Sequence, residues 1–166
     1  YLGRHGTDRA AAAVLIGAVP PRMVQTPDFP GGLPMEALDQ IRDATLNNRS
    51  QFYRDLPANQ FYGFNRPGVA LNQGLVDKWW FQAMQGGIKG QYDCVKAFSE
   101  TDFSEDLKRI DVPVFVMHGD DDQVVPIAVG GLRSIKLLSK GTLKVYPGYP
   151  HGMATTQADV INPDIL

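Results

Sequence analysis

Three short apolar stretches stand out along the 166-residue chain, at about residues 11–17, 113–118 and 143–146. The first two are unbroken, which predicts strands buried on both faces, as in parallel sheets. Helical periodicity fills the interval between Pro126 and Gly141, which separates the last two stretches. Strand, helix and strand in this order predict a βαβ unit of an open α/β sheet. We therefore expect three parallel strands that are neighbours in sequence order.

The long stretch between the first two predicted strands carries no strand pattern. A loop rich in proline and glycine comes first, and apolar residues then recur at helical spacing in three segments. Residues 33–105 are therefore expected to be mostly helical and to form a cap over the carboxyl edge of the sheet. The sheet would then come from about residues 1–22 and 106–166, which makes the whole chain one partial domain.

Both ends of the chain carry signals of helix termini. The first six residues are typical of the last turn of a helix, because Arg4 and His5 suit the negative end of the helix dipole and Gly6 suits the next position. Asn162 and Pro163 are typical of a helix start. This pattern predicts an excised piece of a longer chain, expected to be inactive and poorly stable alone.

Composition mainly excludes classes of protein. With 43% hydrophobic and 20% charged residues, the chain is expected to be globular. A net charge of −2 without a basic run argues against nucleic-acid binding. The longest apolar run, residues 10–19, is shorter than the roughly 18 residues of a membrane span, and no targeting signal opens the chain. Cys94 is the only cysteine, and its helical context predicts a buried side chain rather than a nucleophile. These features favour a cytoplasmic location.

Two residues with candidate chemistry follow the last two predicted strands. Asp122 follows the second strand and His151 the third, at the edge where open α/β sheets place their ligand sites. A carboxylate beside an imidazole fixes its tautomer and stabilises the imidazolium, so that the imidazole can serve as a general base. The spacing alone leaves open a solvated acidic turn and an ordinary loop histidine.

The acids and the other histidines also allow metal-binding and structural interpretations. The run Asp120, Asp121 and Asp122 could attract Mg²⁺ or Ca²⁺. Consecutive aspartates do not converge on one ion as the alternating calcium loop does, so no metal site is expected. His5 and His118 have no partner nearby in the sequence, and structural roles are expected for both.

Several segments resemble a known family. Residues 114–126 closely resemble the acid-bearing segment of α/β-hydrolases, in which a glycine and two variable residues precede the catalytic aspartate. Residues 143–153 look like the last strand and histidine loop of the same family. Residues 15–21, 97–103 and 150–153 are similar to the cofactor-free (non-haem) chloroperoxidases, which are also arylesterases and perhydrolases. The resemblance implies the C-terminal part of an α/β-hydrolase fold, a parallel sheet flanked by helices with an inserted helical cap.

The resemblance also implies a catalytic triad of serine, Asp122 and His151. The family's serine lies in a Gly-x-Ser-x-Gly elbow. All five serines of the chain lack the flanking glycines, so the nucleophile and the oxyanion donors are expected upstream of Tyr1. The glycine spacing selects Asp122, and its neighbours Asp120 and Asp121 are expected to face solvent.

The implied substrates are small esters or carboxylic acids, with no cofactor and no metal. Hydrogen peroxide can replace water in this family, which gives a peracid that oxidises halide. A homo-oligomer is compatible with the resemblance, whereas nucleic-acid and membrane partners are not expected. Two alternatives stay open: a non-catalytic small-molecule-binding member of the fold, and a dehalogenase with an aspartate nucleophile.

Overall fold

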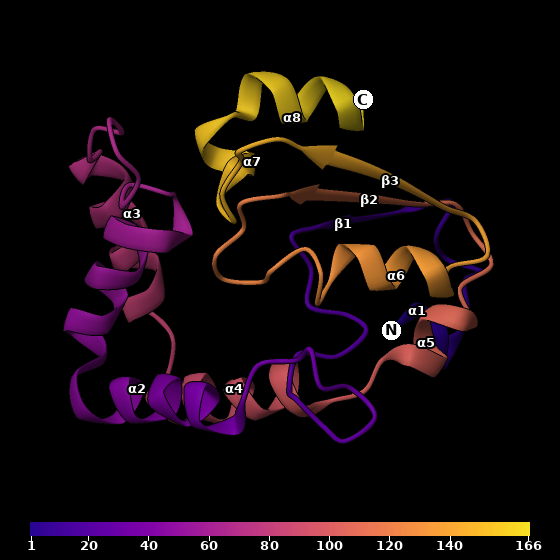
Figure 1. Ribbon diagram of the computed structural model, residues 1–166, viewed down its shortest axis with the longest axis horizontal. Coiled ribbons are helices and arrows are strands. Elements are labelled where there is room, and N and C mark those ends of the chain that lie inside the picture. Colours follow the sequence, from indigo (N-terminus) through magenta and orange to yellow (C-terminus); the bar gives the residue numbers. More distant parts are fainter.

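The computed structural model describes all 166 residues, as a three-stranded parallel sheet with helices on both faces (Figure 1). The strands are β1 (Ala13–Ile16), β2 (Val114–Gly119) and β3 (Gly141–Tyr146), in the spatial order β1-β2-β3. Both pairings are parallel. The predicted α/β class and the parallel arrangement of neighbouring strands are therefore confirmed.

The central strand β2 organises the core. Its residue Val116 pairs with Leu15 of β1 and with Leu143 of β3. Val116 faces one apolar cluster, and Met117, one residue further on, faces a second cluster on the other side of the sheet. The prediction that the first strand is buried on both faces is wrong, because β1 has no fully buried residue. Val14 is 42% exposed, because β1 is an edge strand with only β2 beside it.

Short helices cover the two faces of the sheet (Figure 1). One face carries α1 (Leu2–His5), α5 (Ser104–Lys108) and α6 (Gly131–Leu137), and the other carries α7 (Met153–Thr156) and α8 (Ala158–Ile165). None of these helices combines the length and the apolar character that a membrane span requires.

Two predicted helix starts are wrong. The helix expected from Asn162 begins earlier, at Ala158, and Pro163 lies inside α8. Ile161 is fully buried against the sheet, so packing fixes the helix upstream, and the proline removes only one backbone hydrogen bond.

The helix expected from Pro126 begins at Gly131. The carbonyl of Pro126 accepts the amides of Val129 and Gly130 in a separate turn. The break follows from packing, because Gly130 and Gly131 lie against the ring of His118.

The residues between β1 and β2 form a helical segment that lies beyond the carboxyl ends of the strands (Figure 1). It contains α2 (Met35–Leu56), the π-helical turn η1 (Pro57–Phe61), α3 (Gln73–Met84) and α4 (Ile88–Glu100). Helix α2 packs against both α3 and α4. The loop after η1 is hydrogen-bonded to the loops that follow β2 and β3, which places this helical segment next to Asp122 and His151.

Candidate active site

The loops after β2 and β3 bring Asp122 and His151 into contact. Nδ1 of His151 lies 2.7 Å from Oδ2 of Asp122. Asp122 is 5% exposed, whereas the side chain of His151 is 20% exposed. The pair that the family resemblance implies is therefore in hydrogen-bond contact, and the partner of His151 is Asp122 rather than either neighbouring aspartate.

The local backbone holds the Asp122 carboxylate in place. Its Oδ1 accepts the backbone N–H groups of Val124 at 2.9 Å and Val125 at 2.8 Å, which leaves Oδ2 directed at His151. Burial alone would raise the pKa of Asp122, but the nearby imidazoles of His118 and His151 and the hydrogen bond from the Val125 amide lower it to about 2. The carboxylate is therefore ionised at neutral pH and able to orient an imidazole and stabilise its cation.

His118 lies beside Asp122, although the sequence analysis did not assign it to the site. Its Nε2 donates to the carbonyl of Val125 at 2.8 Å and lies 3.4 Å from Oδ2 of Asp122. The side chain is fully buried, and its Nδ1 has no hydrogen-bond partner. A structural role was expected for a lone histidine. The missed signal is its position at a strand end, four residues before the acid.

The three consecutive aspartates have three different partners. Asp120 is exposed, and its Oδ1 accepts the N–H of Gly148 at 2.6 Å. Asp121 also faces solvent, with its side chain 45% exposed, and it forms an ion pair with Arg66 that the sequence did not indicate. The three carboxylates therefore do not converge on one point.

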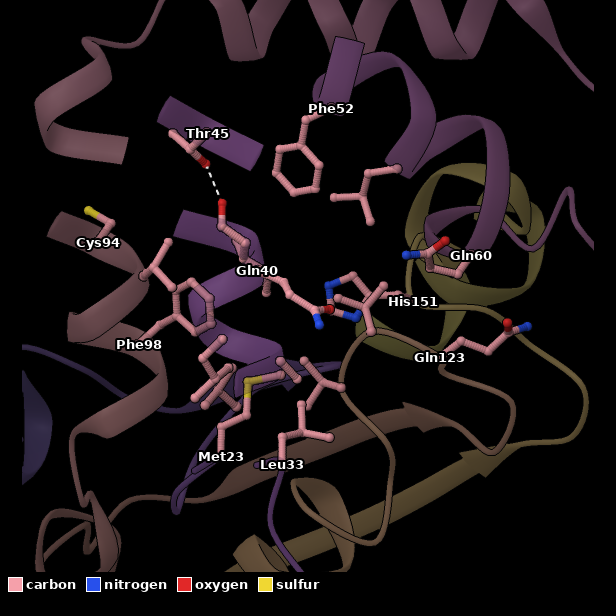
Figure 2. Close-up of a pocket in the computed structure, with 18 of the residues that line it drawn as sticks. Met23, Leu33, Gln40, Thr45, Phe52, Gln60, Cys94, Phe98, Gln123 and His151 are labelled. Carbon is pink, nitrogen blue, oxygen red and sulfur yellow. Dashed lines mark hydrogen bonds between the residues drawn. The ribbon is translucent and has the colours of Figure 1, made fainter. Parts of the chain in front are cut away.

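A cavity of about 800 Å³ lies between the helical segment and the carboxyl edge of the sheet (Figure 2). Fifteen of its 22 lining residues are hydrophobic, and His151 is one of the polar ones. Figure 2 shows Gln60 and Gln123 on the His151 side of the cavity and Cys94 on the opposite side. An apolar chamber with a few polar groups suits a small organic ligand.

The prediction of a buried Cys94 is wrong. The thiol side chain is exposed, because α4 turns this position toward the cavity instead of toward a packed neighbour.

Gly17 is a second residue of the site that sequence reasoning missed. It directly follows β1 with a φ of +53°, a left-handed conformation that favours glycine. A Cβ at this position would lie 3.1 Å from Oδ2 of Asp122 and 3.2 Å from Nδ1 of His151. The available signal was a glycine at the carboxyl end of a predicted strand.

Gly17→Ala is expected to cost about 1–2 kcal/mol of stability through the backbone and to displace the His151 imidazole from Asp122 by crowding their contact. The matched control is Gly6→Ala, since Gly6 has a φ of +88° but nothing within 4 Å of a Cβ. Thermal unfolding measures the first effect, and the proton NMR signal of the His151 Nδ1–H measures the second. The same His151 signal in the two variants would contradict this role of Gly17.

A parallel sheet that presents an aspartate and a histidine from successive strands at its carboxyl edge is the arrangement of an α/β hydrolase. The family described as alpha/beta hydrolase fold matches residues 1–154, and the chain belongs to this family.

Among individual proteins, the chain is 55% identical over 166 residues to the non-heme haloperoxidase of Rhodococcus erythropolis, covering 100% of this chain and 61% of that protein. It is 53% identical over 166 residues to the bifunctional esterase/perhydrolase of Acinetobacter calcoaceticus, covering 100% of this chain and 60% of that protein. The crystal structure of a bromoperoxidase from Bacillus anthracis superposes with a TM-score of 0.92 at 30% identity, over 99% of this chain and 60% of that one. The chain thus spans about 60% of the length of the curated relatives it matches.

Proposed function

We propose that Asp122 and His151 are the acid and the base of a serine esterase that also acts as a perhydrolase and cofactor-free haloperoxidase. The observation that carries the proposal is the 2.7 Å contact between His151 and a buried, ionised Asp122 beside an apolar cavity. The names of the two relatives, a haloperoxidase and an esterase/perhydrolase, support the same pair of activities.

The nucleophile in this proposal comes from outside the 166 residues. None of the five serines lines the cavity or hydrogen-bonds to His151. The hydroxyls of three are committed to backbone carbonyls, and Ser50 accepts a hydrogen bond from Trp80, leaving only Ser104, at the start of α5. Since the relatives are longer than this chain, the serine and the oxyanion donors are assigned to the part of the protein that these residues do not include.

The first half of the reaction follows from the tautomer of His151. Because Nδ1 donates to Asp122, Nε2 carries the lone pair and takes the proton of the serine hydroxyl as the serine attacks the ester carbonyl. The Asp122 carboxylate stabilises the resulting imidazolium. The imidazolium then protonates the departing alcohol, and an acyl-serine remains.

The second half uses His151 as a base again. It deprotonates water, which attacks the acyl-serine and releases a carboxylic acid and the free serine. With hydrogen peroxide in place of water, the same step releases a peracid. A peracid transfers one oxygen atom to a halide ion, which gives the carboxylate and a hypohalous acid. The halide oxidation thus needs no redox group on the protein.

The test is turnover of phenyl acetate by the complete protein that carries these residues. We expect saturable hydrolysis that falls by at least about 10³-fold in His151→Ala. His5→Ala is the matched control, since His5 lies at the end of α1 and stacks on Tyr1. We also expect phenylmethanesulfonyl fluoride to inactivate the protein by labelling one serine.

Three outcomes would contradict the proposal. Full activity in His151→Ala would show that His151 is not the catalytic base. Saturable binding of the ester without product would indicate a non-catalytic binding protein of this fold. Covalent capture of a haloalkane on an aspartate, with no labelling by the sulfonyl fluoride, would indicate a dehalogenase.

A further inference from the structure

Arg66, in the loop between η1 and α3, contacts both loops that carry the candidate pair. Its Nη1 donates to the carbonyl of Gly148 at 2.8 Å, and its Nη2 donates to the carbonyl of Asp121 at 2.8 Å. The guanidinium also forms an ion pair with the Asp121 carboxylate. Asp121 directly precedes Asp122, and Gly148 lies three residues before His151. One side chain of the helical segment therefore joins the loop of the acid to the loop of the base.

Gly148 is held from two sides by these contacts. Its carbonyl accepts from Arg66, and its N–H donates to Oδ1 of Asp120 at 2.6 Å. Both partners of Gly148 thus link it to the loop after β2. The two loops are consequently fixed to each other by a closed ring of hydrogen bonds that lies next to the contact between Asp122 and His151.

The residues just before Arg66 add contacts on the other side of the pair. The carbonyl of Phe61 accepts a hydrogen bond from the N–H of Gly152 at 2.7 Å. The aromatic ring of Phe61 packs edge-on against the imidazole of His151, with the ring centres 4.9 Å apart. Nδ2 of Asn65 donates to Oε1 of Gln123 at 2.8 Å. This short stretch of the helical segment therefore touches the chain before and after the acid, and before and after the base.

The pocket around Arg66 is shaped for a guanidinium. The side chain is 20% exposed, and its Nε is buried without a partner. Gly63 adopts a φ of +71°, and a Cβ there would lie 2.8 Å from Nη1 of Arg66. A planar guanidinium reaches two carbonyl oxygens at once in a fixed geometry, which the single ammonium group of a lysine does not reproduce.

We propose that Arg66 is a positioning residue, which locks the loops of Asp122 and His151 together and so holds the imidazole in line for proton transfer. The effect on turnover rests on the proposed function, whereas the effect on the orientation of His151 does not. Arg66 touches neither reacting atoms nor the candidate pair itself, so its loss is expected to change the rate of the chemical step more than the binding of substrate.

The kinetic test compares Arg66→Ala and Arg66→Lys with the parent, in the complete protein and with phenyl acetate. We expect kcat to fall about 10–100-fold in Arg66→Ala, with KM within about twofold, because small misplacements of a catalytic group cost rates of this size. Arg66→Lys is expected to lie between the two, and added guanidinium ion is expected to restore part of the activity of Arg66→Ala. The matched control is Arg54→Ala, since Arg54 belongs to the same helical segment but pairs with Asp77 and stacks on Trp80.

The second measurement is the proton NMR signal of the His151 Nδ1–H, assigned by its absence in His151→Ala. A proton shared with an ionised carboxylate resonates at low field, and we expect this signal in the parent and in Arg54→Ala. It is expected to broaden or disappear in Arg66→Ala and to return with guanidinium ion. This readout reports on the orientation of the imidazole even if His151→Ala keeps its activity and the proposed function fails.

Two results would overturn the proposal. One is an unchanged His151 signal in Arg66→Ala, whatever happens to the activity. The other is a loss of activity that follows only the folded fraction, with no response to guanidinium ion. If Arg66→Ala does not fold, the same two measurements are made on Arg66→Lys, and an unchanged His151 signal in that variant overturns the proposal. The lysine keeps the charge but cannot bind both carbonyl oxygens in the same geometry.

Discussion

Asp122→Asn is expected to lower kcat of the complete protein on the order of 10⁴-fold while the fold stays in place. The reason lies in the two oxygens of the carboxylate. Oδ1 accepts the amides of Val124 and Val125, so the carbonyl oxygen of an asparagine takes that place and its NH₂ group faces His151. Nδ1 of the imidazole must then accept a hydrogen bond, which puts the proton on Nε2. An imidazole with its proton on Nε2 cannot accept one from a serine.

The pKa of Asp122 gives this variant a second expected effect. A carboxyl group whose pKa is lowered from 3.8 to about 2 stabilises the folded state above about pH 4, and this contribution is lost as the pH falls toward 2. Asp122→Asn is therefore expected to be less stable than the parent at pH 7, with the difference shrinking as the pH falls toward 2. Urea unfolding at several pH values measures this.

Asp159→Asn is the matched control for both effects, because Asp159 is exposed on α8 and away from the pair. Its kcat and its unfolding curve are expected to match those of the parent. An Asp122→Asn protein that is folded and turns over phenyl acetate at a near-normal rate would dismiss Asp122 as the orienting acid.

The parts of the fold that the sequence predicts are those in which local pattern and burial agree. The unbroken run before His118 predicts a strand in the middle of a sheet, and β2 is the central strand with almost every residue buried. The stretch from Leu143 to Tyr146 is separated from it by one helix, which forces a parallel neighbour. These two strands alone place Asp122 and His151 at one edge. The order of elements therefore predicts that the two loops are neighbours, whereas the choice of Asp122 as the partner of His151 depends on the family resemblance.

The remaining parts depend on contacts that no local pattern encodes. Arg66 lies 55 residues from Asp121 and 82 from Gly148, and nothing around it in the sequence indicates which loops it joins. The exposure of Cys94 follows from its position on the wall of the cavity, and an amphipathic pattern does not distinguish a cavity wall from a packed interface. The partial exposure of β1 likewise depends on which strands lie beside it. Sequence reasoning finds the reacting groups more readily than the groups that hold them.

The 166-residue chain alone is expected to hydrolyse phenyl acetate no faster than an equal concentration of free imidazole. The acid and the base are present and in contact, but no serine of the chain reaches them. We also expect the isolated chain to be only marginally stable and to associate, because β1 presents an unpaired edge with Val14 42% exposed. Sedimentation and an ester assay on the purified chain measure both properties.

Joining the chain to the part of the Rhodococcus erythropolis haloperoxidase that it does not cover is expected to give an active protein, since 55% identity over the shared part favours compatible packing. We expect ester hydrolysis in the joined protein, its loss in the joined His151→Ala variant, and normal activity in the joined His5→Ala variant. A monomeric, cooperatively folded and active isolated chain would contradict the assignment of the nucleophile to other residues. Labelling of that active chain with phenylmethanesulfonyl fluoride would then identify which of its own hydroxyls attacks the ester.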